Sequence, residues 1–210
     1  MPRVHFPVPL ILASASERRR TILGEAGYAF GVREPGDAED AITSAPTPEA
    51  LALEKARAKA EKIALELHGK PSLVLGADTI VVAGKDVLGK PLDRADALRI
   101  LARLSGTRHC VITGLALRLA PGNFAPALFA ETTWVTFRTL KPAEIEAYVA
   151  SGEADGKAGA YAIQERGDRF VERLEGSYTN VVGFPLELFE ERAPRALREW
   201  GFECPPQMIP

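Results

Sequence analysis

The chain has 210 residues, of which 46% are hydrophobic and 26% charged, so it is long enough to bury a core as one elaborate domain or as two lobes. Its formal charge of −2 argues against a general nucleic-acid or anionic-membrane surface and leaves only local basic sites for polyanions. No apolar run approaches the roughly 20 residues that span a bilayer, and residues 1–9 lack the apolar core of a signal peptide. We therefore expect a cytoplasmic protein with no membrane partner and no stable nucleic-acid partner.

The first half of the chain alternates short apolar runs with amphipathic runs, which indicates strands and helices in turn. We expect strands at 10–13 and 29–33, a helix at 18–26 ended by Gly27, a polar loop at 34–46, and a long helix capped by Thr47, opened by Pro48 and ended at Gly69. A short strand at 73–77 follows, and then the runs 79–83 and 87–88 flank Gly84-Lys85-Asp86 in the manner of a hairpin.

The second half continues the alternation. We expect another helix that is capped by Asp93, followed by two strands at 109–119 and 128–137 that form an antiparallel pair. After them we expect a helix at 141–150, an extended segment at 169–174 and a closing helix at 185–200. No repeat, low-complexity segment or clear linker interrupts the pattern. We expect an α/β fold with an elongated mixed sheet flanked by helices, in which residues 1–210 form one domain with a cleft between two lobes.

The most informative segment is residues 14–20, Ser-Ala-Ser-Glu-Arg-Arg-Arg, between the first strand and the first helix. A helix N-terminus leaves N–H groups unpaired and carries the positive end of the helix dipole, so hydroxyls and guanidinium groups there suit a phosphate ester. The alternative is that Ser16 only caps the helix and the arginines are a solvated first turn. Three cations oppose the dipole at that end, which favours the anion site.

Two carboxylates are candidates for work on a phosphate. Asp78 follows an apolar strand, where α/β sheets present ligands, and could bind a divalent cation or take a proton from water. Glu39 lies in the acidic loop Asp37-Ala38-Glu39-Asp40. The alternatives are that Asp78 is a turn former and that Glu39 is merely solvated. Mg²⁺ usually takes one or two carboxylates together with substrate phosphates, and the pair suits that chemistry.

Cations and an amide elsewhere could complete such a site. Residues 84–90 match the first seven positions of a P-loop, but Pro91 replaces the required Ser or Thr, so we reject that interpretation. Lys90 and Lys55 can each offer an ammonium to a phosphate, although a lysine on a helix surface is more often solvated. Gln164 follows a small-residue run at 156–163 and offers a donor and an acceptor, or is an exposed amide in a structural loop.

Other chemistries find little support. Cys110 and Cys204 are far apart, and with three histidines they give no zinc-type spacing. No Ser/His/Asp arrangement and no Gly-x-Gly-x-x-Gly fingerprint is visible, so nucleophilic and dinucleotide-redox functions lose ground.

Taken together, these segments resemble the Maf family of nucleoside triphosphate pyrophosphatases. The matching segments occur in the family's order over nearly the whole chain, at 12–19, 54–56, 76–79, 89–91, 104–106, 157–161, 163–164, 176–178 and 180–183. Two positions depart from the family pattern. Gly156 stands where the family usually has Asp, and Glu165 stands where it tends to have Gly.

The resemblance implies a metal-dependent hydrolase that cuts a nucleoside triphosphate between the α and β phosphates. The resemblance makes Asp78 the proton acceptor. Within the family, subgroups differ at the positions of Arg18, Thr79 and Gln164, and the combination of residues found here is similar to that of the dTTP/UTP-preferring subgroup. A homodimer would also suit the family. Modified pyrimidine nucleotides, in a house-cleaning role, would share the same chemistry. The alternative from a different class is a nucleotide- or DNA-binding regulator of cell division and septum formation.

Our hypothesis combines the residues as follows. Ser16, Arg19, Lys55 and Lys90 hold the triphosphate, and Mg²⁺ or Mn²⁺ binds Asp78 and Glu39. Water oriented by Asp78 attacks the α phosphorus. Gln164 and Arg18 read the acceptor, donor, acceptor edge of uracil or thymine. A binding regulator needs the cations but not the carboxylate pair, so the presence of Asp78 and Glu39 favours the enzyme.

Overall fold

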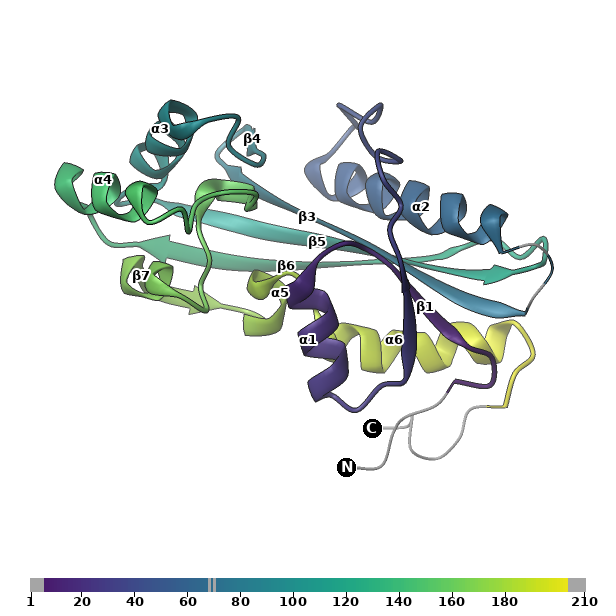
Figure 1. The fold of residues 1–210 in the computed structure, drawn as a ribbon. Coiled ribbons are helices and arrows are strands. Elements are labelled where there is room, and N and C mark those ends of the chain that lie inside the picture. The colour runs from purple at the N-terminus through teal and green to yellow at the C-terminus, as the bar shows by residue number, and fades with distance from the viewer. Residues whose placement is uncertain (1–5, 68, 70, 204–210) are drawn as a thin grey trace. The chain divides into compact units, whose positions relative to one another are not determined.

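In the computed structural model, which describes residues 6–67, 69 and 71–203, seven strands form one mixed sheet (Figure 1). The strands are β1 (Leu10–Ala13), β2 (Phe30–Arg33), β3 (Ser72–Ala83), β4 (Asp86–Leu88), β5 (Arg108–Ala120), β6 (Ala127–Phe137) and β7 (Val171–Glu175). Their order is β2-β1-β3-β5-β6-β7, with β4 paired to β3. β1 is parallel to β2 and β3, whereas β3 with β4 and β6 with β7 are antiparallel. The predicted α/β fold with a mixed sheet is confirmed.

The helices that flank the sheet fall close to the predicted ranges, except α5 and the two short 3-10 turns, which were not predicted. They are α1 (Glu17–Glu25), α2 (Pro48–Glu66), α3 (Arg94–Leu104), α4 (Pro142–Ala150), α5 (Tyr178–Val182) and α6 (Leu186–Glu199), with short 3-10 turns η1 (Ala158–Ala160) and η2 (Arg166–Phe170). Both predicted caps are present, because Thr47 accepts from the Ala50 N–H at 3.1 Å and Asp93 from the Asp96 N–H at 2.8 Å. No helix in the described ranges combines the length and apolar character needed to cross a bilayer.

The chain divides into two compact units. The first comprises Met1–Asp78, Thr113–Glu131 and Gly183–Pro210, and the second comprises Thr79–Ile112 and Thr132–Val182. Strands β3, β5 and β6 each contribute residues to both. The single domain over residues 1–210 and the cleft stay predictions.

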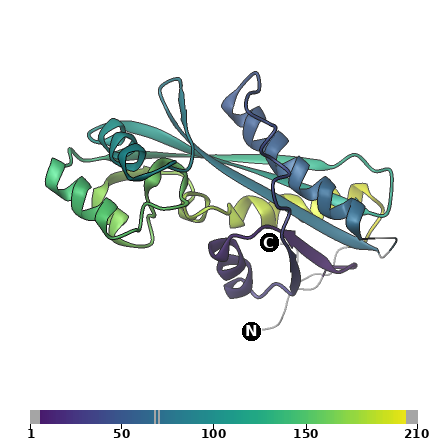
Figure 2. The ribbon, with the colours of Figure 1, turned by 45° about the horizontal axis from the view of Figure 1, so that its top comes forward.

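In the first unit α2 lies along one face of the strands, and α1 and α6 lie on the other (Figures 1 and 2). Two glycines let α2 approach closely. A Cβ on Gly76 of β3 would lie 2.9 Å from the Ala60 nitrogen, and one on Gly114 of β5 would lie 2.7 Å from the Leu53 nitrogen. The alanine-rich face of α2 therefore packs directly on the backbone of the sheet, in a core that includes Ala56, Ala60, Ile63 and Val74.

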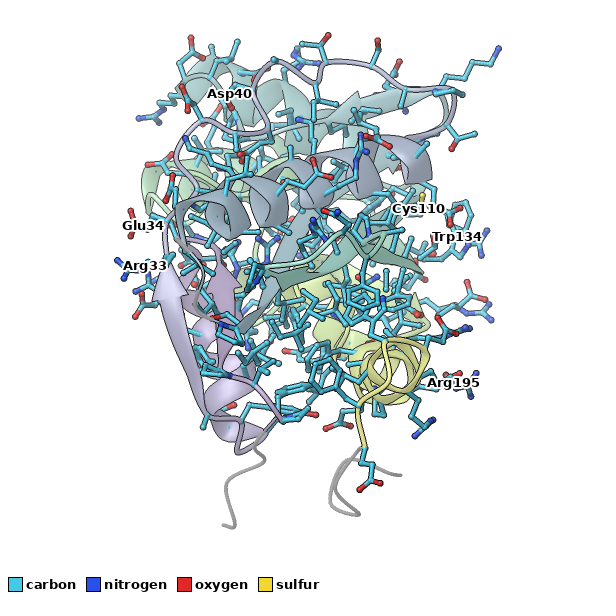
Figure 3. All side chains as sticks on the ribbon, turned by 90° about the vertical axis from the view of Figure 1, so that its right-hand side faces the viewer. Arg33, Glu34, Asp40, Cys110, Trp134 and Arg195 are labelled. Atoms are coloured by element: carbon cyan, nitrogen blue, oxygen red, sulfur yellow. The ribbon has the colours of Figure 1, made fainter. Side chains whose placement is uncertain are left out.

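The opposite face of this unit is filled by aromatic rings. Phe189 of α6 meets Phe6, Tyr28 and Phe184 with ring centroids 5.3–5.9 Å apart. These rings hold α6 and the turn after α1 together. The outer surface is charged instead, and Figure 3 shows Arg33, at the end of β2, and Arg195, on α6, projecting outward.

In the second unit α3 packs against α4 and η1. The core between them is aromatic, and Phe137 of β6 lies 4.8 Å from both His109 and Tyr161 by ring centroids. Cys110 is buried on β5, whereas Cys204, His5 and His68 lie outside the described residues. The cysteine that the structure describes behaves as a small apolar side chain, as its surroundings predict.

His109 makes the stability of this unit sensitive to acid. Its ring is fully buried, with Nε2 3.0 Å from the Tyr161 hydroxyl. Burial lowers the pKa of His109 from 6.5 to about 4, and a hydrogen bond to the backbone of Thr107 opposes this shift. The unfolded chain binds a proton below pH 6.5 and the folded chain does not, so the stabilisation is complete above that pH and is lost as the pH falls toward 4.

We expect the free energy of unfolding to fall by up to about 3 kcal/mol between pH 7.5 and pH 4.5 through His109 alone. Urea unfolding of wild type and His109→Gln at both pH values measures the contribution of His109 to this loss of stability. The variant should lose less stability than wild type by that amount. An equal loss in both proteins would place the acid sensitivity elsewhere.

One strand differs from prediction. Residues 73–77 and 79–83 were expected as separate runs, with Asp78 just after a strand, but β3 runs unbroken through Asp78. Strand β3 lies between β1 and β5 in the sheet and also pairs with β4. β1 pairs with β3 only as far as Ala13 opposite Gly76, while β4 pairs with Val81–Ala83. Asp78 therefore lies beyond the carboxyl end of β1, although it is inside β3.

Candidate active site

Two acidic side chains from distant parts of the first unit meet at one ammonium group. Lys59 Nζ on α2 lies 2.6 Å from Asp78 Oδ1 and 2.7 Å from Glu39 Oε1. It also lies 3.5 Å from the carbonyl oxygen of Ala77. The three side chains are largely buried, with exposed fractions of 8% for Lys59, 14% for Asp78 and 17% for Glu39. The predicted carboxylates are thus brought together, with a lysine between them.

The local fold explains how these groups converge. The loop between β2 and α2 carries Glu39 and is also tied to α2 by an ion pair of 3.2 Å between Asp37 and Lys62. The close approach of α2 at Gly76 places Lys59 above the stretch of β3 that holds Asp78. The pair of carboxylates therefore depends on a glycine two residues before Asp78.

Arg19 of α1 connects the start of α1 to this stretch of β3. Its Nη1 donates to the Ala77 carbonyl at 2.8 Å and to Ser14 Oγ at 3.1 Å, and its Nε donates to the Gly183 carbonyl at 2.9 Å. The residue is only 8% exposed. This guanidinium positions the segment after β1 against β3, and its predicted contact with phosphate stays a prediction.

The charges around Arg19 are coupled to the carboxylate pair. Burial lowers the pKa of Arg19 from its ordinary value, Asp78 and Glu39 raise it, and Arg18 lowers it. Because an arginine stays charged in proteins, the buried guanidinium contributes a fixed positive charge beside two carboxylates. The site therefore holds both signs of charge away from bulk solvent.

Ser16 precedes α1, and its side chain makes no capping hydrogen bond to that helix. Ser16 nevertheless occupies the N-cap position of α1, and its carbonyl accepts from the Arg20 N–H at 3.3 Å. Arg20 turns away, pairing with Glu17 at 3.3 Å and Glu34 at 3.5 Å. Arg18 and Arg20 are both half-buried, whereas Arg19 is buried.

Three predicted residues belong to the second unit, namely Thr79, Lys90 and Gln164. Lys90 and Gln164 are both exposed on loops. The turn η1, which precedes Gln164, contacts the residue before Lys90, because the Gly159 N–H donates to the Gly89 carbonyl at 3.1 Å. A Cβ on Gly159 would also come within 2.8 Å of Val81 of β3. The roles of the three predicted residues toward a nucleotide stay predictions.

The two departures from the family pattern have local explanations. Gly156 has a left-handed backbone, with φ of 67°, which glycine adopts without strain. Glu165 lies 3.9 Å from Lys157, measured between Oε2 and Nζ. The added negative charge is therefore partly balanced within the same loop.

Lys59 is the residue that sequence reasoning missed. Lys55, one turn earlier on α2, was chosen instead, and it is half-buried. The signal was present in the helical pattern. Lys59 falls on the same stripe of α2 as the buried Ala52, Ala56 and Ile63. A lysine at a core-facing position needs a buried partner, and the two carboxylates are its partners.

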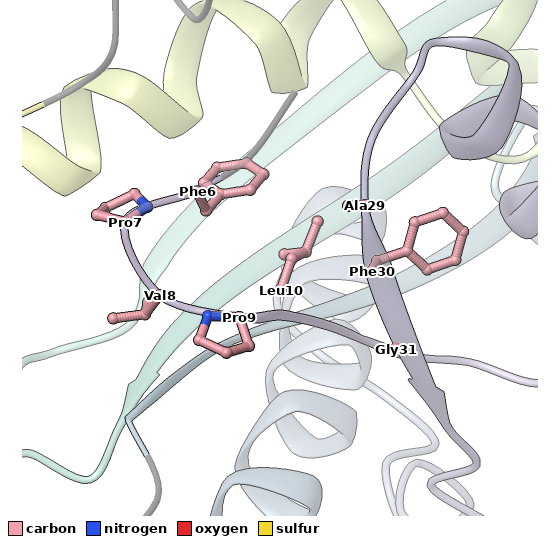
Figure 4. A pocket seen from close by; sticks show the side chains of 8 residues that line it. All are labelled: Phe6, Pro7, Val8, Pro9, Leu10, Ala29, Phe30 and Gly31. Carbon is pink, nitrogen blue, oxygen red and sulfur yellow. The ribbon is translucent and has the colours of Figure 1, made fainter. Parts of the chain in front are cut away.

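A hollow of about 380 Å³ lies elsewhere in the first unit, lined by Phe6, Pro7, Val8, Pro9, Leu10, Ala29, Phe30 and Gly31 (Figure 4). Its lining has no titratable side chain, and it lies at the start of β1, whereas the carboxylates lie beyond the end of that strand. Nothing in this hollow offers the chemistry of the carboxylate pair.

A mixed α/β sheet with paired carboxylates and buried cations beyond the end of a parallel strand defines a class of proteins suited to bind phosphorylated ligands. The family model described as Maf-like protein matches residues 9–193, most of the chain. The chain belongs to the Maf family.

Curated relatives match over most of both lengths. A dTTP/UTP pyrophosphatase of Anaeromyxobacter dehalogenans (strain 2CP-C) is 45% identical over 93% of this chain and 96% of its own. The protein of the same name from Moorella thermoacetica is 48% identical over 87% of this chain and 92% of its own length. The dTTP/UTP pyrophosphatase from Vibrio cholerae is 46% identical over 84% of this chain and 92% of its own length.

Among solved structures, a nucleoside-triphosphatase, dITP/XTP pyrophosphatase, from Mycobacterium abscessus covers 91% of this chain and 97% of its own. Its TM-score is 0.40 and its identity 13%, a likeness too loose to carry an argument.

Proposed function

We propose that this chain hydrolyses dTTP and UTP to the nucleoside monophosphate and pyrophosphate, with Mg²⁺ or Mn²⁺ held by Glu39 and Asp78. The observation that carries the proposal is the convergence of these two carboxylates on one point, 2.6 and 2.7 Å from Lys59 Nζ. Relatives at 45–48% identity that bear the name dTTP/UTP pyrophosphatase support the same reaction.

The donor set fits such a cation. Mg²⁺ and Mn²⁺ prefer carboxylate, carbonyl and water oxygens, and Mg²⁺ commonly combines one or two carboxylates with substrate phosphates. No cluster of three or more His, Cys, Asp and Glu suited to a metal occurs in the described part of the chain. Glu39 and Asp78 would therefore hold the cation jointly with the triphosphate. When bound, it would neutralise charge on the α phosphate and on the leaving pyrophosphate.

Asp78 is the proton acceptor in this proposal. Its carboxylate takes a proton from water as the water oxygen bonds to the α phosphorus, and the bond from that phosphorus to the bridging oxygen breaks. The electron pair of that bond leaves with pyrophosphate. Arg19 donates to the carbonyl of Ala77, the residue before Asp78, and so holds this stretch of β3 in place, while Lys59 contacts Asp78 Oδ1 in the protein without a cation.

The triphosphate tail is assigned to Ser16, Arg19, Lys55 and Lys90. The Ser16 side chain makes no capping hydrogen bond to α1, which is consistent with that assignment. Charge-assisted hydrogen bonds contribute about 1.5–3 kcal/mol each, so a few of them can bind a tetra-anion to a chain of negative net charge.

The pyrimidine base is assigned to Arg18, Thr79 and Gln164. The amide of Gln164 can donate to one group and accept from another, which suits the acceptor, donor, acceptor edge of uracil or thymine. A purine presents a different pattern and should be hydrolysed more slowly. The same proposal includes hydrolysis of modified pyrimidine nucleotides, a location in the cytoplasm and assembly as a homodimer.

The test is release of pyrophosphate from dTTP, UTP, CTP and GTP by the full chain, with Mg²⁺, with Mn²⁺ and with EDTA. We expect turnover of dTTP and UTP that exceeds turnover of GTP and that stops in EDTA. Nucleotide binding without pyrophosphate release under any condition would overturn the proposal and would favour the regulator of cell division.

A further inference from the structure

Lys59 lies where the proposed function requires a cation. Its Nζ is within 2.7 Å of an oxygen from each carboxylate and 3.5 Å from the Ala77 carbonyl oxygen. The side chain is 8% exposed and is less accessible than either acid that it contacts. A lysine so enclosed is stabilised by the two negative charges, and they in turn are stabilised by it.

An ammonium and a divalent cation would compete for these oxygens. Both are hard cations that take oxygen partners, and Mg²⁺ binds them at about 2.0–2.1 Å. Since Glu39 and Asp78 already contact Lys59 Nζ, a divalent cation bound to the same two carboxylates would lie within a few ångströms of the ammonium, and like charges at that separation repel strongly. The long flexible stem of lysine permits the ammonium to move away.

We propose that Lys59 is a built-in counter-cation, which neutralises Glu39 and Asp78 when no divalent cation is bound and withdraws when one binds. The inference rests on the proposed function in taking these carboxylates as the cation ligands. Its consequence is a low affinity of the free protein for the cation alone. The phosphates of the nucleotide supply the additional ligands that displace Lys59.

The chain offers a matched control on the same helix. Lys62 lies one turn after Lys59 and pairs with Asp37 of the loop that carries Glu39, at 3.2 Å. Its side chain is 39% exposed. Lys62→Met therefore removes the same formal charge from the same helix without touching Asp78 or Glu39.

The test is a titration of Mn²⁺ alone, without nucleotide, into wild type, Lys59→Met, Lys59→Gln and Lys62→Met, with free Mn²⁺ counted by electron paramagnetic resonance. We expect both Lys59 variants to bind Mn²⁺ about tenfold or more tightly than wild type, because a repelling charge is gone. Lys62→Met should bind as wild type does. In EDTA, Lys59→Met should also melt below wild type, and Mn²⁺ should raise its melting temperature more.

Lys59→Gln keeps a hydrogen-bond donor and serves if Lys59→Met does not fold. Equal or weaker Mn²⁺ binding by the folded Lys59 variants would overturn the inference and leave Lys59 as a fixed support for Asp78. Failure of the two proposals is distinguishable. Tighter Mn²⁺ binding in a protein that cleaves no nucleotide would reject the reaction alone, and cation-dependent cleavage with unchanged Mn²⁺ affinity would reject the counter-cation alone.

Discussion

Asp78→Asn is expected to lower the turnover of every nucleoside triphosphate by about 10³-fold, within the usual contribution of a general base. The amide cannot take the proton of the attacking water. It keeps an oxygen that can accept from Lys59 Nζ, which lies 2.6 Å from Oδ1 in the wild type. The fold should therefore survive while the chemistry is lost. Pyrophosphate release on dTTP, UTP, CTP and GTP measures the change, and a thermal melt confirms that the variant is folded.

Gln164→Ala is the contrasting variant for the same assay. Gln164 lies exposed on a loop of the second unit, so its removal should leave stability unchanged. We expect a selective loss on dTTP and UTP, because only the contact with the base is removed. Equal losses on all four nucleotides would contradict the base-reading assignment, and retention of wild-type turnover by Asp78→Asn would contradict the role of Asp78.

Gly76→Ala is expected to lower the free energy of unfolding by roughly 2–3 kcal/mol, as overpacking of a tight core does. A Cβ there would lie 2.9 Å from the Ala60 nitrogen and closer still to the Ala56 carbonyl, both of them backbone atoms of α2. The helix must move outward, and Lys59 lies between those two alanines. Turnover should fall as well, because α2 also carries Lys55, which the proposed function assigns to the triphosphate. Urea unfolding and the pyrophosphate assay measure the two effects.

Gly31→Ala provides the control. Gly31 is also a strand glycine of the first unit, on the exposed β2, and a Cβ there meets nothing within 4 Å. Its substitution should change stability by no more than a few tenths of a kcal/mol, as is usual for exposed sites. If Gly76→Ala proved as stable as Gly31→Ala, the close packing of α2 on β3 would not be what positions Lys59.

The helices of this fold were predictable because their signals are local. Helix starts are predicted at Thr47, which precedes Pro48, and at Asp93, and both residues cap their helices in the structure. The boundary at Asp78 was not predictable in the same way. Whether a strand continues past a polar residue depends on which neighbours pair with it, and the neighbour β4 joins β3 only beyond Asp78. Pairing partners are tertiary information.

In the candidate site, too, some features were predictable from the sequence and others were not. Its residue types could be read from the chain, since Asp78, Glu39 and the arginines at 18–20 each carry a recognisable chemistry. What each does could not be read, because Arg18, Arg19 and Arg20 are consecutive and yet Arg19 alone of the three is buried. A helix turns about 100° per residue, so neighbours in sequence face different surroundings.

The sequence by itself determined the α/β class, the caps of the long helices and membership in a family, because these depend on local patterns and on the order of short motifs. Only the tertiary structure decided that Lys59 lies between Glu39 and Asp78. That decision required α2 to rest on Gly76, and the fit between a helix and a sheet depends on shapes brought together from distant parts of the chain.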